Sequence, residues 1–223
     1  MDASTAAMLL SRVEPFKGLD ERARLTLVEH ATRRVVDRGQ VVFWQDDPGE
    51  AMFVLLEGSV KLVVCSRDGE LIELHRHDAP AIFGELALLD AGPRSASAEA
   101  VERSTLLVVT RPELLRLLRS DEQVAEALLR TLGAMVRRTT RQISDLAFLS
   151  LQGRVAAKLL DLAGPDGSRT RRVTQVELAT MVGGARQTVN QALRWLESRG
   201  YIRSDGRVFE ILDREQLRRL AGG

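Results

Sequence analysis

The hydrophobic pattern of this chain changes its period part-way along, and this change limits the folds that the chain can adopt. Between residues 41 and 109, short β-branched, aromatic and aliphatic runs alternate with turn sequences. Runs at intervals of about ten residues predict a small β-sandwich or β-barrel. After Arg111-Pro112 the period becomes helical. We therefore predict an α+β chain whose strands and helices occupy separate segments. The predicted strands cover residues 41–43, 52–56, 60–64, 71–74 and 106–109.

A long helix, predicted from about residue 121 to residue 148, carries a heptad pattern. Its seam positions step by four and three residues and are Leu128, Leu132, Met135, Thr139, Gln142, Leu146 and Leu149. Such a seam favours a helix that pairs with its own copy. The alternative is a single amphipathic helix on its own domain, but a helix buried only for stability would carry leucine in place of Thr139 and Gln142. The pattern therefore predicts a homodimer.

The C-terminal region has the pattern of a helix-turn-helix. Thr174 and Glu177 have the spacing of a capping box, and Gly183-Gly184 ends the helix that they begin. A second helix is predicted over residues 186–199. A β-hairpin is predicted over residues 201–211, and we interpret it as a wing. One face of the second helix is polar or basic and lacks acids, with Arg186, Gln187, Asn190, Gln191 and Arg194. Such side chains hydrogen-bond base edges and phosphates. The alternative is an ordinary three-helix bundle with a polar surface.

Charge and composition exclude several classes of protein. Residues 151–223 hold 13 Lys/Arg against 8 Asp/Glu, whereas residues 1–150 hold 19 against 23, and a basic end of this kind is typical of nucleic-acid binding. Charged residues interrupt every long apolar run, so we expect no membrane span. The start of the chain lacks the basic residues of a secretory signal, so we expect a cytoplasmic protein. The single cysteine, Cys65, excludes an internal disulfide and a four-cysteine iron–sulfur cluster.

Residues 83–97 combine side chains that suit a ribose and a phosphate. The pair Gly84-Glu85 precedes the pair Arg94-Ser95 in this short segment. Glycine lets backbone N–H groups approach a ligand closely, and a carboxylate accepts hydrogen bonds from ribose hydroxyls. The guanidinium fork of an arginine neutralises and hydrogen-bonds a phosphate. This segment is the strongest candidate for a small-molecule site.

Together these patterns resemble the cyclic-AMP receptor protein family of bacterial transcription regulators, which includes the fumarate–nitrate regulator type. The resemblance covers about residues 14–213 and has three anchors: residues 83–97, the hinge-like segment 145–156, and the sequence of residues 186–190. It implies three parts. Residues 1–120 would form a cyclic-nucleotide-binding β-barrel (a double-stranded β-helix), residues 121–150 a dimerisation helix with its hinge, and residues 151–223 a winged helix-turn-helix.

The resemblance also implies a function and its residues. It implies a cyclic-AMP-responsive homodimer, with no metal and no enzymatic activity, that binds palindromic double-stranded DNA when ligand is bound and works with RNA polymerase. Gly84 and Glu85 would hold the ribose, Arg94 and Ser95 the cyclic phosphate. Thr139 and Thr140 would contact adenine, one in its own subunit and one across the dimer. The implied ligand-binding residues are Gly84, Glu85, Leu86, Arg94, Ser95, Ala96, Thr139 and Thr140. The implied DNA-binding residues are Thr174, Arg186, Gln187, Thr188, Asn190, Gln191 and Arg194.

The chain also departs from the family's type member. Gln187 replaces an acid and Gln191 replaces a base in the second helix, so the usual half-site of the type member is not predicted here. Met135 replaces a basic residue near the ligand. A regulator with another effector, or one that binds DNA constitutively, is therefore an alternative.

Three other classes are weaker alternatives. Gly69, His75, His77 and Glu85 match part of a cupin metal motif, but the step from His77 to Glu85 is too long and a third histidine is missing. A haem sensor would need axial ligands, for which Cys65 and His77 are candidates by residue type alone. A nucleotide-binding module without DNA contact leaves the basic second helix unexplained.

Overall fold

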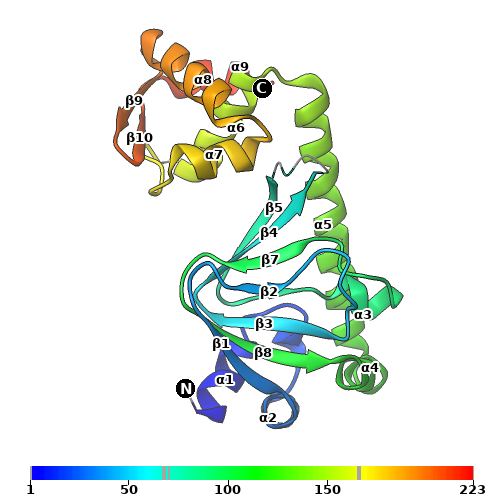
Figure 1. Ribbon diagram of the computed structural model, residues 1–223. Helices are drawn as coiled ribbons and strands as arrows, with labels where there is room; N and C mark the ends of the chain where they lie inside the picture. The colour runs from blue at the N-terminus through cyan, green and yellow to red at the C-terminus, as the bar shows by residue number, and fades with distance from the viewer. Residues whose placement is uncertain (1, 67–68, 70, 165–166, 223) are drawn as a thin grey trace. The chain divides into compact units, whose positions relative to one another are not determined.

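The computed structural model describes residues 1–223 except 1, 67–68, 70, 165–166 and 223 (Figure 1). The chain divides into two compact units, residues 1–64 with 74–137 and residues 65–73 with 138–223. The predicted boundaries fell after residues 120 and 150, whereas this division runs through the long helix. The prediction of an α+β chain with an N-terminal sheet domain, a long helix and a C-terminal helix-turn-helix is confirmed.

The N-terminal part of the chain contains two four-stranded sheets (Figure 1). In order across the first sheet the strands are β1 (Thr32–Val36), β8 (Ser104–Thr110), β3 (Ala51–Glu57) and β6 (Ala81–Phe83). Across the second they are β2 (Val41–Phe43), β7 (Ser97–Ala100), β4 (Ser59–Cys65) and β5 (Leu71–Asp78). The helices of this part are α1 (Ala3–Leu10), α2 (Glu21–His30), α3 (Leu86–Asp90), α4 (Arg111–Ser120) and α5 (Glu122–Phe148), with a 3-10 turn at Phe16–Gly18.

A tight turn at Gly58 joins β3 to β4. Its φ of +91° lies in the left-handed region, and a Cβ there would lie 2.3 Å from Ser104 Oγ. Ser104 Oγ also accepts a hydrogen bond from the Ser59 amide at 3.1 Å, so the turn is held against β8. Only glycine fits this position without strain.

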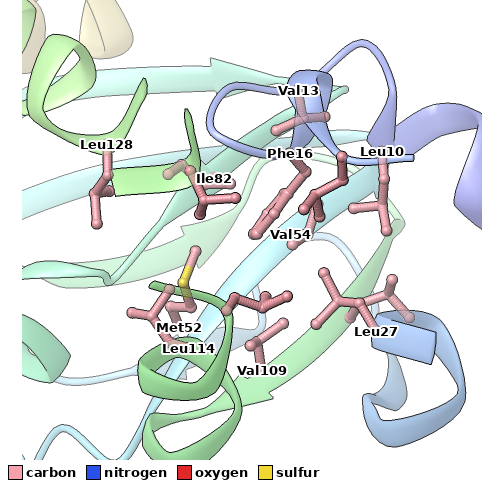
Figure 2. Packing of buried hydrophobic residues seen from close by; sticks show 14 of the residues in the cluster. Leu10, Val13, Phe16, Leu27, Met52, Val54, Ile82, Val109, Leu114 and Leu128 are labelled. Atoms are coloured by element: carbon pink, nitrogen blue, oxygen red, sulfur yellow. The ribbon is translucent and has the colours of Figure 1, made fainter. Parts of the chain in front are cut away.

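Two apolar clusters fill the N-terminal part. One gathers inward side chains of both sheets, among them Phe53, Val60, Phe83 and Leu106, and so binds the sheets together. The other lies between the first sheet and the helices (Figure 2). Figure 2 shows that this second cluster includes Leu128 of α5.

The position of Leu128 corrects the predicted heptad seam. Leu128 is only 3% exposed and packs in the core of its own domain, so it is unavailable to a second helix. The large apolar side chains that α5 leaves exposed include Leu129, Val136 and Ile143, which are 68%, 62% and 62% exposed. They follow one another at intervals of seven residues. The exposed apolar stripe is therefore displaced by one residue from the predicted one at these positions.

The C-terminal part has the predicted winged helix-turn-helix. Its elements are α6 (Leu151–Ala163), α7 (Gln175–Val182), α8 (Arg186–Ser198), β9 (Ile202–Asp205), β10 (Val208–Ile211) and α9 (Arg214–Leu220). They share one apolar core, to which α8 contributes Val189, Leu193 and Leu196. The capping box is present: the Glu177 amide donates to Thr174 Oγ1 at 3.1 Å, and the Thr174 amide donates to Glu177 Oε2 at 2.7 Å. Within the part of the chain that the structure describes, no helix is long and apolar enough to cross a membrane.

Candidate nucleotide and DNA sites

The segment from Gly84 to Ser97 forms a loop with a short helix between β6 and β7. Gly84 follows β6 directly and has a φ of +78°. A Cβ at Gly84 would lie 3.0 Å from Arg94 Nη1 and 3.2 Å from the Phe43 ring. Any side chain here would therefore press on the arginine of the same segment, in addition to the cost of the left-handed backbone.

Arg94 lies at the centre of this segment. It is 4% exposed, and its Nη1 donates to the Gly84 carbonyl at 2.8 Å. Its Nη2 donates to the Ala51 carbonyl at 2.6 Å. Its Cζ lies 4.2 Å from the centre of the Phe43 ring, within the range of a cation–π contact. Backbone hydrogen bonds of 2.9 Å join Arg94 to Asp46 and Asp47. The guanidinium is thus fixed from three sides.

The Arg94 guanidinium is equipped to receive an anion. Burial lowers the pKa of Arg94 from its ordinary value, while the nearby carboxylates of Asp47 and Glu85 raise it. The group stays charged, because arginine does not deprotonate in proteins. Its Nε is buried and has no hydrogen-bond partner among the described residues. A buried charged N–H without a partner is costly, and an oxygen of a bound phosphate would satisfy it.

The structure brings most of the predicted ligand residues together. Glu85 is 7% exposed and precedes α3, Ala96 is 4% exposed, and Leu86 is half-buried. Ser95 is exposed beside Arg94. Thr139 and Thr140 are exposed on α5 and belong to the other compact unit, so their contact with a ligand stays a prediction.

A hollow of about 820 Å³ lies next to the same segment but is a different feature. Its lining includes Pro48, Gly49, Ala87, Pro93 and Arg111, and it includes neither Glu85 nor Arg94. The groups suited to a ribose and a phosphate therefore do not face this hollow. Among the described residues, no group of three or more His, Cys, Asp or Glu could hold a metal ion.

The outer face of α8 presents most of the side chains that the sequence assigned to DNA. Arg186, Gln187, Thr188, Gln191 and Arg194 are exposed, and Asn190 is half-buried. The Thr188 hydroxyl donates to the Ala185 carbonyl at 2.8 Å, so it is engaged in the first turn of the helix. Thr174 caps α7 and is half-buried.

Three further exposed arginines of the C-terminal part were not singled out from the sequence. They are Arg171, Arg172 and Arg207. The Val173 amide donates to the Arg207 carbonyl at 2.7 Å, so the turn of the wing lies beside the segment that leads into α7. The basic residues within 169–172 could have been noticed in the sequence as candidates for a phosphate contact. Only the hydrogen bond shows that the backbone of Arg207 lies beside this segment.

Both parts of the chain match known domain families. Residues 33–121 match the cyclic nucleotide-binding domain, and residues 153–220 match the Crp-like helix-turn-helix domain. The chain belongs to the CRP/FNR family of transcription regulators. It is thus a DNA-binding regulator with a cyclic-nucleotide-binding domain, as the sequence predicted.

Individual relatives agree with this assignment. The chain is 34% identical to the CRP-like cAMP-activated global transcriptional regulator of Mycobacterium tuberculosis, over 96% of this chain and 98% of that protein. It is 31% identical to the cyclic AMP receptor protein of Thermus thermophilus, over 93% and 96% of the two chains. In fold it is similar to the c-di-GMP-responsive global regulator CLP of Xanthomonas campestris, with a TM-score of 0.77, 23% identity, and coverage of 86% and 99%.

Proposed function

We propose that this protein is a homodimeric regulator whose binding to a palindromic DNA site is switched on by cyclic AMP. The observation that carries the proposal is the buried Arg94. Its Nε has no partner among the described residues, and its pKa is lowered by burial and raised by the nearby carboxylates of Asp47 and Glu85. A 3′,5′-cyclic nucleotide offers a phosphate for Arg94 and a ribose hydroxyl for Glu85. The two groups thus match adjacent parts of one small ligand.

Cyclic AMP is preferred to other effectors on two grounds. The relatives that are 34% and 31% identical are named for cyclic AMP. Thr139 and Thr140 offer hydroxyls that donate to a ring nitrogen and accept from an amino group, which suits adenine. The fold alone does not select the effector, because the similar Xanthomonas regulator is named for c-di-GMP. Another nucleotide, or constitutive DNA binding, remains the alternative function.

We place the dimer contact on the exposed stripe of α5. Leu129, Val136 and Ile143 take one seam position of the heptad, and Leu132, Thr139 and Leu146 take the other. A second copy of this helix would cover the stripe and bring two α8 helices to one DNA site. The two α8 helices would then enter successive major grooves about 34 Å apart. We further propose that the protein acts in the cytoplasm, contacts RNA polymerase and catalyses no reaction.

DNA binding is expected to depend on the ligand. Palindromic sites can be selected from a random library and then titrated with the protein in the presence and absence of cyclic AMP. The DNA affinity should be about 5- to 150-fold higher with cyclic AMP than without it. Operator DNA should tighten cyclic-AMP binding by the same factor, because the coupling is reciprocal. Equal DNA affinity at zero and saturating cyclic AMP would show a constitutive binder instead.

The base preference of the selected site is expected to depend on Arg186. Arg186→Ala should relax the preference at one position of each half-site by about 1–3 kcal/mol, because arginine reads a guanine edge through two hydrogen bonds. Arg218→Ala on α9, which removes the same charge from an exposed residue of another helix, is the matched control. An unchanged site preference in the Arg186 variant would remove this residue from base recognition.

Phe43 is expected to support the ligand through Arg94. Phe43→Leu removes the ring that lies 4.2 Å from the guanidinium, and cyclic-AMP affinity should fall by about 2- to 30-fold, the value of a cation–π contact. The neighbouring Trp44 is 61% exposed, so Trp44→Leu serves as the control with unchanged affinity. Calorimetry measures both, and circular dichroism checks that each variant is folded. Equal affinities in the two variants would contradict the supporting role of Phe43.

A further inference from the structure

Two of the three histidines of the chain stand side by side on β5. His75 and His77 alternate with Arg76 along the strand and so point to the same face of the sheet. Their ring centres lie 4.4 Å apart in an edge-to-face arrangement. Both are half-buried. A half-buried imidazole keeps part of its edge accessible while the rest of the ring is packed.

The face to which they point is the interior between the two sheets. The His77 ring centre lies 6.0 Å from that of Phe83, which is completely buried. Phe83 is the residue directly before Gly84-Glu85. The histidines therefore share an interior with the segment proposed to hold the ribose.

A continuous row of ring contacts connects these histidines to the phosphate-binding arginine. From Phe83 the row continues to Phe43, at 6.0 Å between ring centres, and from Phe43 to the Arg94 guanidinium at 4.2 Å. Phe53 stacks on both phenylalanines, at 5.5 and 5.2 Å. Arg94 stands at one end of this row and His75 at the other.

A nucleotide has the same order of parts as this row. Its phosphate, ribose and base follow one another, so a phosphate at Arg94 and a ribose at Glu85 direct the base away from the arginine. An imidazole can stack on a base, and its two ring nitrogens can donate to or accept from a base edge. The row ends in two polar rings, those of His77 and His75.

We propose that His75 and His77 contact the base of the bound cyclic nucleotide and select a purine over a pyrimidine. A purine offers a larger ring system for stacking on an imidazole than a pyrimidine does, so its contact should contribute more to the affinity. This inference rests on the proposed function, because it requires a cyclic nucleotide in the site.

The first test separates contact with the base from general support of the site. His75→Ala and His77→Ala should each lower the affinity for cyclic AMP by about tenfold, the scale of one stacked base contact. Both should lower the affinity for cyclic CMP much less. Both should leave unchanged the affinity for methyl riboside 3′,5′-cyclic phosphate, which has no base. His30→Ala, on α2, is the matched control.

The outcomes distinguish this inference from the proposed function. An equal loss for all three ligands would assign the histidines a structural role and overturn the inference. Unchanged affinities of His75→Ala and His77→Ala for cyclic AMP would also overturn the inference. Neither of these two outcomes would contradict the proposed binding of a cyclic nucleotide by the wild type. Failure of the wild type to bind any cyclic nucleotide would overturn both.

A spectroscopic measurement on the wild type needs no variant that could fail to fold. With ¹⁵N-labelled histidine the full chain gives imidazole signals from three residues only. Saturating cyclic AMP should shift the imidazole signals of His75 and His77. It should not shift the signals of His30, whose Nδ1 lies 2.7 Å from the Thr26 carbonyl oxygen. Binding that is seen by calorimetry without a shift of the His75 and His77 signals would refute the contact.

Discussion

Replacing Arg94 with alanine is expected to lower the affinity for cyclic AMP by at least about tenfold. The hydrogen bonds of a charged group contribute roughly 1.5–3 kcal/mol, which corresponds to about 10- to 150-fold in the dissociation constant. The Arg94 guanidinium is buried and held by the carbonyls of Gly84 and Ala51, so the free protein has already ordered it. The affinity that it provides is therefore little reduced by the entropy of ordering a mobile side chain.

Arg94→Lys separates the charge from the shape of the group. Lysine keeps the positive charge but lacks the planar fork, so it cannot reach both carbonyls and a phosphate at once. Its affinity should fall between those of the wild type and Arg94→Ala. Arg103 is the control, because its side chain is 79% exposed and Arg103→Ala removes a charge of the same sign. Calorimetry on the folded proteins gives the cyclic-AMP affinities of the wild type, Arg94→Ala and Arg94→Lys. An Arg94→Ala protein that binds cyclic AMP as the wild type does would refute the proposed phosphate site.

The residue types of this site could be predicted because they lie close together in the sequence. Gly84, Glu85 and Arg94 stand within one short segment, and each suits one part of the ligand. The support of Arg94 could not be predicted in the same way. The Ala51 carbonyl is 43 residues away along the chain, and only the pairing of strands brings it to the guanidinium. The sequence predicts for Phe43 only an ordinary position in a strand. In the structure, the Arg94 guanidinium lies over the Phe43 ring.

The strands show the same limit. β3 and β4 were predicted because they are long apolar runs. β1 was missed because Arg33 and Arg34 interrupt its apolar pattern. β7 was missed because it is short and consists of small and acidic residues, Ser97–Ala100. Both become strands through pairing with distant partners, β1 with β8 and β7 with β2 and β4. Local propensity carries no record of such pairing.

A single acidic substitution on the exposed stripe of α5 is expected to separate the proposed homodimer. Val136 is 62% exposed and occupies the centre of the stripe between Leu129 and Ile143. In a homodimer, Val136→Glu places two like charges in an apolar seam, where each must be removed from water without a partner. Light scattering at micromolar concentration should give the mass of a monomer. DNA affinity should fall by at least about 100-fold, because the second half-site is no longer linked to the first.

The choice of Val136 depends on knowledge that the heptad alone does not contain. Leu128 and Leu129 are adjacent leucines, and the sequence pattern cannot say which of them faces a partner. The structure shows that Leu128 is 3% exposed inside its own domain, so a charge there would unfold that domain rather than report on the dimer. Ala134 is exposed on the side of α5 away from the stripe, and Ala134→Glu adds the same charge. If Ala134→Glu and Val136→Glu both remain dimers, the contact between subunits lies elsewhere than on this stripe.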